Sequence, residues 1–140
     1  MKTQIKFLSV TRVLLIHDRL VKRIGGSAGV RDMGLIESAV ARPQSGFNGK
    51  YLYTNIFDMA AALLQSLLKN HPFVDGNKRT ALTSASIFLE INGYLLNRND
   101  NEIVEFAVRV DNANLTLEEI SEWLEKNTNC LLYTSPSPRD

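Results

Sequence analysis

Residues 56–79 read IFDMAAALLQSLLKNHPFVDGNKR and form the middle of the predicted fold. Up to Asn70, apolar side chains recur at spacings of three and four and cover more than one face of a helix. We therefore expect a central, buried helix that Asn55 opens. Pro72 cannot continue this helix, and a second helix is expected to begin near Lys78.

Helical patterns also occupy the sequence on both sides of this stretch. Upstream, an apolar stripe that begins at residue 8 stops at Gly25-Gly26, and Asp32 caps a shorter helix that Pro43 terminates. Downstream, the helix that follows the motif is expected to stop at Gly93. Two further helices are predicted to start at Asp100 and at the capping box Thr116-Leu117-Glu118-Glu119.

The loop at residues 43–54 has a different character. Asn48-Gly49 stands between aromatic residues, which is typical of the tight turn of a small hairpin. No stretch of useful length alternates apolar and polar residues with the period of a strand. The sequence therefore predicts an all-α fold, a bundle of about six helices with one possible small β-hairpin.

One domain accounts for most of the chain. A length of 140 residues suits a single domain, which we place at residues 1–129. Residues 130–140, CLLYTSPSPRD, are rich in Ser and Pro and lack periodicity, so an unstructured tail is expected there. The tail is either a native disordered end or a translated scar of cloning or library origin. We favour the scar and assign the tail no function.

Composition argues against several classes of protein. The apolar fraction of 44% and the charged fraction of 22% are typical of a globular protein. A net charge of +1 gives no indication of binding to nucleic acid or to a membrane surface, and no apolar run approaches the ~18 residues of a membrane span. The single cysteine, Cys130, cannot form an internal disulfide, and nothing ahead of the domain resembles a signal peptide. We therefore expect a soluble cytoplasmic protein that contacts neither nucleic acid directly nor a membrane.

The residue types after Pro72 suit an anion site. A new helix offers unpaired backbone N–H groups and the positive end of its dipole, and Gly76 lets the backbone turn tightly there. Asn77 can donate an amide hydrogen bond to a phosphate oxygen, and Lys78 and Arg79 add positive charge. Asp75 can hold a Mg²⁺ that bridges phosphates, because this ion prefers one or two carboxylates plus phosphate oxygens.

His71 and Phe73 complete the motif. Imidazole exchanges protons near neutral pH, so His71 is suited to removing the proton of a hydroxyl group. Phe73 is expected to be a structural anchor in the core. Structural roles explain the polar residues too: His71 as a C-terminal helix cap, Asp75 as an N-cap, and Lys78-Arg79 as a solvated face. Spacing alone does not decide between a phosphate site and a polar loop.

Three other kinds of site are not expected. GNKRT lacks the upstream glycine of the P-loop pattern GxxxxGK[ST], and a helix rather than a strand precedes it. His71 and Asp75 are four residues apart but not on one helix, and no third ligand is evident, which argues against structural zinc. A cysteine nucleophile is not expected either, because Cys130 lies in the predicted tail.

HPFVDGNKR resembles the signature of Fic domains, HxFx(D/E)GN followed by a small residue or lysine and then arginine. The form with lysine resembles the death-on-curing (Doc) branch of that superfamily. The flanking stretches GGSAGVRDMGLIESAVARPQ and TALTSASIFLEINGY are similar to the same branch. The resemblance extends from about residue 10 to residue 127.

The resemblance implies a Fic-type helical domain that binds ATP with Mg²⁺ and modifies a hydroxyl group of another protein. For the Doc branch it implies a toxin that transfers the γ-phosphate of ATP to a threonine or serine of elongation factor Tu and so inhibits translation. His71 is then the catalytic general base and Asp75 the Mg²⁺ ligand. The implied phosphate-binding residues are Gly76, Asn77, Lys78 and Arg79.

The resemblance also implies a role for the loop at residues 43–54. In this family the corresponding segment is a flap that aligns the target by β-strand addition. Phe47 and Tyr51 are the residues expected to flank it.

Two departures from the broader Fic pattern favour the Doc branch. Lys78 stands where members that transfer AMP carry glycine, and Leu82 replaces the second arginine of the longer pattern. An AMP transferase is therefore the alternative function, and a non-catalytic binding module is a second alternative. The presence of His71, Asp75 and Asn77 at the expected spacing argues against the binding module.

No built-in inhibitory helix is expected. The inhibitory pattern of Fic proteins is [S/T]xxxE followed by glycine or asparagine; Ser86–Glu90 and Ser121–Glu125 have the spacing but not the following residue. We therefore expect a Phd-like antitoxin in trans, with a disordered segment that folds on this protein. Val13 or Leu20 on the first helix are candidates for receiving it, although core packing is the favoured role for both.

Overall fold

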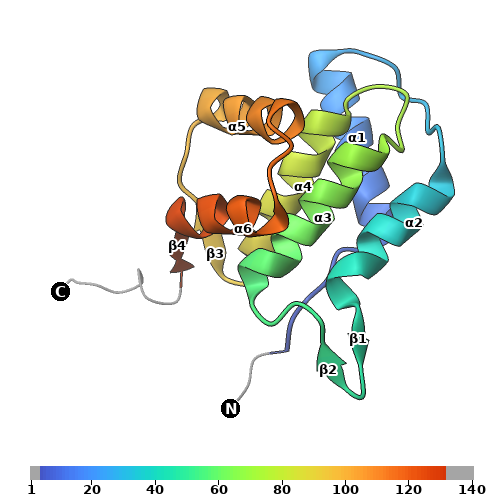
Figure 1. The fold of residues 1–140 in the computed structure, drawn as a ribbon. Helices are drawn as coiled ribbons and strands as arrows, with labels where there is room; N and C mark the ends of the chain where they lie inside the picture. Colours follow the sequence, from blue (N-terminus) through green and yellow to red (C-terminus); the bar gives the residue numbers. More distant parts are fainter. Residues whose placement is uncertain (1–3, 132–140) are drawn as a thin grey trace.

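A computed structural model describes residues 4–131 and shows a bundle of helices (Figure 1). A 3₁₀ turn, η1 (Arg42–Gln44), directly follows the helix that ends at Ala41. The helical bundle confirms the predicted all-α class. Among residues 4–131, none of the helices combines the length and the apolar character that a membrane span requires. The helices are α1 (Val10–Ile24), α2 (Met33–Ala41), α3 (Ile56–Asn70), α4 (Asn77–Ile91), α5 (Asp100–Asn112) and α6 (Leu117–Lys126).

Side-chain caps define most of the helix starts. Asp32, Asn55 and Thr116 each accept a hydrogen bond from a backbone N–H of the following turn, at the starts that the sequence predicts. Two further caps were not predicted: Ser9 caps α1, and Asn99 caps α5 in a capping box. These signals act within three residues, which is why the helix starts can be predicted from the sequence.

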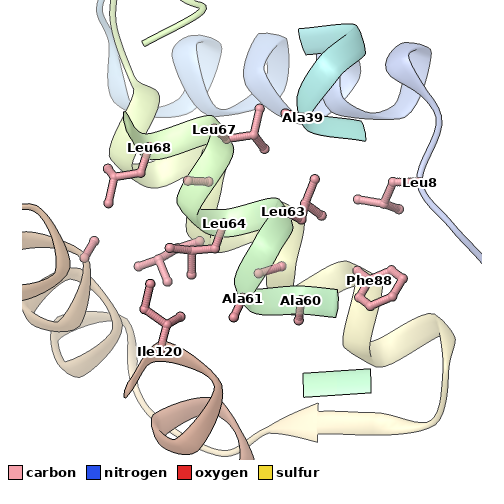
Figure 2. Close-up of a cluster of buried hydrophobic side chains, with 14 of the residues drawn as sticks. Leu8, Ala39, Ala60, Ala61, Leu63, Leu64, Leu67, Leu68, Phe88 and Ile120 are labelled. Carbon is pink, nitrogen blue, oxygen red and sulfur yellow. The ribbon is translucent and has the colours of Figure 1, made fainter. Parts of the chain in front are cut away.

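Helix α3 lies in the middle of the bundle and packs against α2, η1, α4 and α6 (Figure 1). This position confirms the prediction of a central helix. Figure 2 shows the core, with Leu8, Phe88 and Ile120 around the leucines of α3. Each leucine removed from water contributes about 1.5–3 kcal/mol to the stability of the fold. The position of α3, and of the loop that follows it, is therefore well determined by the core. The buried residues of α3 are Met59, Ala60, Ala61, Ala62, Leu63, Leu64, Ser66, Leu67 and Leu68.

The two residues of α1 that were considered for binding an antitoxin have different surroundings. Val13 is fully buried in the core, so its candidacy as a docking residue is wrong and the alternative of core packing is correct. Leu20 is half-buried against the core and also lines a groove between α1 and α4.

The hairpin predicted around Asn48-Gly49 is present. Strand β1 (Gly46–Phe47) pairs antiparallel with β2 (Lys50–Tyr51). Asn48 and Gly49 have φ values of 54° and 76°, the left-handed pair that a tight hairpin turn of this kind requires. Phe47 is 80% exposed and Tyr51 is 45% exposed.

A second two-stranded ribbon was not predicted. Strand β3 (Tyr94–Leu96) pairs antiparallel with β4 (Thr128–Cys130). Strands of three residues are too short to show the alternation that identifies a strand in sequence. The predicted start of the tail at Cys130 is therefore wrong, because Cys130 pairs with Tyr94. The rest of the predicted tail, from residue 132 on, lies outside the described residues.

Candidate anion and phosphate site

The loop at residues 71–76 joins the end of α3 to the start of α4 (Figure 1). His71 is the C-cap of α3, with a left-handed backbone at φ 49° and ψ 59°, and it is exposed. The N-cap of α4 is Gly76, at φ 80°, so the alternative prediction of Asp75 as N-cap is wrong. Gly76 has no side chain that could cap the N–H groups of the first turn of α4. The first N–H groups of α4 can therefore bind an anion.

Phe73 and Asn77 hold the loop from the inside. Phe73 is only 2% exposed and belongs to the core, in agreement with its predicted role as an anchor. The side-chain amide of Asn77 donates to the carbonyl of Phe73 at 2.9 Å and accepts from its backbone N–H at 3.0 Å. The structure thus gives Asn77 a loop-shaping role that the sequence analysis missed. Its contact with phosphate stays a prediction.

The segment between α1 and α2 clamps the loop from the side. The backbone N–H of Arg31 donates to the carbonyl of Pro72 at 2.7 Å, and the N–H of Val74 donates to the carbonyl of Gly29 at 3.0 Å. An isolated antiparallel β-bridge pairs Val30 with Phe73. The loop is therefore held as if it were a short strand, by contacts between residues more than forty positions apart.

Arg31 also closes the end of α3. Its guanidinium donates to the carbonyl of Asn70 and to that of His71, each at 2.6 Å. The last carbonyls of a helix lack partners and carry the negative end of the dipole, so a cation here satisfies both requirements. Sequence reasoning did not identify Arg31, because the residues that it caps lie about forty positions away.

His17 is the other histidine of the chain, and it lies beneath the loop. It is 2% exposed, on the same buried face of α1 as Val13. Its ring stacks on the ring of Phe73, with centroids 3.8 Å apart and planes 10° apart. Its Nε2 lies 2.8 Å from the backbone carbonyl of Asp75. The sequence feature that could have identified His17 is a polar side chain within the apolar stripe of α1.

Asp75 presents its carboxylate at the surface of the loop. Oδ1 accepts from the N–H of Gly76 at 2.9 Å, and Oδ2 lies 3.4 Å from the N–H of Ser27. Within residues 4–131, no group of three or more His, Cys, Asp or Glu side chains could hold a metal. An exposed lone carboxylate beside an anion site fits Mg²⁺, which is held by one or two carboxylates together with phosphate oxygens and water.

The close approach of Asp75 depends on Gly26. A Cβ on Gly26 would lie 2.6 Å from Oδ2 of Asp75, whereas a Cβ on Gly25 meets no described atom within 4 Å. The two glycines have nearly equal φ values, 107° and 106°. They therefore form a matched pair that differs in contact with Asp75 and hardly in backbone strain.

Gly26→Ala is expected to displace the Asp75 carboxylate, and Gly25→Ala is the control. Both variants place alanine at positive φ, so each should lose about 1–3 kcal/mol of stability. Only Gly26→Ala should move the carboxyl ¹³C chemical shift of Asp75, measured by NMR. Equal shifts in the two variants, or none in either, would contradict the assigned contact.

Lys78 and Arg79 supply the positive charge predicted for the site. Both are exposed in the first turn of α4, and Nζ of Lys78 forms an ion pair with Asp111 of α5 at 3.4 Å. This exposed pair is weak, so Lys78 can exchange its partner for a phosphate at low cost. A surface hollow of about 280 Å³ brings the motif together; its lining residues are His71, Val74, Asp75, Gly76, Asn77, Lys78 and Arg79.

The hairpin is not part of this hollow. It precedes α3, whereas the motif loop follows α3, and the two lie at opposite ends of that helix (Figure 1). Because α3 has 15 residues and a helix rises 1.5 Å per residue, its two ends are roughly 20 Å apart. Phe47 and Tyr51 instead line a separate hollow together with Lys50 and Leu52. The structure therefore does not bring the predicted flap residues next to His71, and their role in binding a target stays a prediction.

The fold and the loop together define a helical domain with a candidate anion site at the N-terminus of α4. The profile of the Fic/DOC family matches residues 7–89, which include all of α3, the whole motif and most of α4. The chain belongs to the Fic/DOC family.

Two relatives place the chain near the Doc branch. It is 57% identical over 72 residues to Toxin Doc of Mycolicibacterium smegmatis, a match that covers 51% of this chain and 55% of that protein. It is 28% identical over 121 residues to Protein kinase doc of Escherichia phage P1, covering 86% of this chain and 94% of that protein. The first match thus spans about half the length of the relative.

Proposed function

We propose that this protein is a Doc-like toxin that transfers the γ-phosphate of ATP to a hydroxyl group of a protein. The observation that carries the proposal is the hollow at the start of α4, where His71, Asp75, Lys78 and Arg79 surround uncapped backbone N–H groups. Phosphoryl transfer requires mainly alignment of the phosphates and neutralisation of their charge, and this arrangement suits both tasks. Similarity to a toxin and to a protein kinase supports the same reaction.

In the proposed step, the hydroxyl oxygen of the target forms a bond to the γ-phosphorus. The bond between that phosphorus and the leaving oxygen of ADP breaks, and His71 takes the hydroxyl proton. His71 is suited to this because it is exposed at the edge of the hollow. The phosphates are held by the backbone N–H groups of α4 together with the side chains of Lys78 and Arg79. Asp75 would hold a Mg²⁺, which would supply neutralising charge.

Transfer of AMP is the alternative reaction. Lys78 lines the hollow at the position where AMP-transferring members carry glycine, and its side chain takes up room there. Leu82, at the position of the second arginine of the wider pattern, is 3% exposed and packs in the core. It therefore offers no charge to a triphosphate. Both observations support the transfer of the terminal phosphate.

The partners follow from the same proposal. The target is elongation factor Tu, on a threonine or serine, which makes the protein an inhibitor of translation in the cytoplasm. Silencing is assigned to a Phd-like antitoxin in trans, because the two [S/T]xxxE sequences lack the residue that completes the inhibitory pattern. A disordered antitoxin segment that folds on this protein would bind with a large interface for its length.

The test uses the purified full chain, elongation factor Tu, Mg²⁺ and ATP labelled at either the γ- or the α-phosphate. The control is His71→Asn. Label transferred from γ-ATP alone, and lost in the control, is the expected result. Label from α-ATP would replace the proposal with AMP transfer. No label in either reaction, repeated with a cell lysate as target, would favour a non-catalytic binding module.

A further inference from the structure

His17 makes two contacts with the motif loop from a buried position on α1, and its ring also limits the space beside Gly76. Its ring lies flat on Phe73, and its Nε2 is 2.8 Å from the carbonyl oxygen of Asp75. A Cβ on Gly76 would lie 3.6 Å from Cδ2 and Nε2 of the same ring. One imidazole therefore supports the loop at the turn into α4, across a sequence separation of 58 residues.

The proton on His17 can be placed by chemistry. A carbonyl oxygen only accepts hydrogen bonds, so Nε2 carries the proton and donates it to Asp75. A polar ring that is 2% exposed costs free energy unless it is hydrogen-bonded, and a purely apolar side chain would fill this space without that cost. The donor on the ring thus points to a role beyond packing.

The bond to Asp75 sets the orientation of a whole peptide group. The Asp75–Gly76 peptide is planar and trans, so its C=O and its N–H point in opposite directions. With the carbonyl directed inward to His17, the N–H of Gly76 points away from the core. There it donates to Oδ1 of the Asp75 carboxylate at 2.9 Å.

A flip of this peptide would damage the anion site. Glycine adopts many backbone conformations, so the Asp75–Gly76 peptide has little intrinsic resistance to rotation. After a flip, the carbonyl of Asp75 would point outward and place partial negative charge where phosphate is proposed to bind. The carboxylate of Asp75 would also lose its hydrogen bond from Gly76.

We propose that His17 is a positioning residue, which keeps the Asp75–Gly76 peptide in the orientation that binds MgATP. This inference rests on the proposed function for its kinetic consequence, and the peptide orientation can be tested without catalysis. The ring stack on Phe73 anchors the imidazole, and the Nε2–H selects the direction of the carbonyl.

Two variants separate the donor from the ring. His17→Phe keeps a flat aromatic ring against Phe73 but has no donor, whereas His17→Gln keeps an N–H donor and loses the ring. In phosphoryl transfer, His17→Phe is expected to raise the KM for MgATP about three- to tenfold, the size of one lost hydrogen bond, with kcat unchanged. His17→Gln is expected to restore most of the wild-type KM.

A stability control and a spectroscopic readout complete the experiment. Ile16→Val removes one buried methylene from the same helix and reports the effect of a weaker core alone; its KM should equal that of the wild type. NMR measures the carbonyl ¹³C shift of Asp75 and the amide ¹H shift of Gly76. Both should move in His17→Phe and neither in Ile16→Val.

Unchanged shifts of Asp75 and Gly76 in His17→Phe would overturn the positioning role, whatever the activity. The same conclusion holds if the KM of His17→Phe equals that of Ile16→Val. If the wild type transfers no phosphate, the proposed function fails and the NMR shifts alone decide on His17. The two failures are therefore distinguishable.

Discussion

His71→Asn is expected to lower phosphoryl transfer by about 10²–10⁴-fold, the usual contribution of a positioned general base. Asparagine retains a polar side chain but cannot take up the hydroxyl proton. It is preferred to alanine because His71 has a left-handed backbone at φ 49°, a conformation that asparagine adopts more readily than most residues. The measurement is the initial rate of label transfer from γ-labelled ATP.

The fold of His71→Asn should be unchanged, because the residue is exposed and its backbone conformation is retained. Thermal unfolding and the affinity for MgATP are the controls, and both should match the wild type. A rate within tenfold of the wild type would show that another group, or water, accepts the proton, and would remove His71 from the proposed catalytic step.

Phe73→Ala is expected to destabilise the fold by about 3–5 kcal/mol, the cost of emptying a fully buried aromatic site. The variant loses packing against the core and the stack on His17 at 3.8 Å. Because Phe73 anchors the loop, the proposed transfer should also be lost even under conditions where most of the protein is folded. Urea denaturation gives the free energy of unfolding.

Phe47→Ala is the matched control for Phe73→Ala. Phe47 is 80% exposed in the hairpin, so the same truncation there should change the free energy of unfolding by less than about 0.5 kcal/mol. Similar losses in the two variants would contradict the assignment of Phe73 as the buried anchor. A loss of target binding in Phe47→Ala, with stability retained, would support the predicted role of the hairpin.

Much of the helix bundle could be predicted because its signals are local. Asp32, Asn55 and Thr116 each cap a helix through backbone groups two or three residues away, and Asn48-Gly49 turns the hairpin between adjacent strands. The apolar residues of α3 recur at helical spacing whatever packs against them. The ribbon of β3 and β4 was missed because its strands have three residues each and pair across more than thirty positions.

The candidate site was predicted only as a set of residues. The sequence places His71, Asp75, Gly76, Lys78 and Arg79 within nine positions, and the structure brings them around one hollow. The supports of the loop could not be predicted in the same way. Their partners come from other elements, and that pairing depends on how the helices pack.

The sequence by itself thus determined the helices, the hairpin and the identity of the motif, because caps, turns and apolar spacing act between near neighbours. Only the tertiary structure decided what holds the motif in shape and how far the hairpin lies from it. Arg31 caps the end of α3 across 40 residues, and His17 supports Asp75 across 58. These contacts arise because burial of the apolar face of α1 and of the leucines of α3 brings distant segments together.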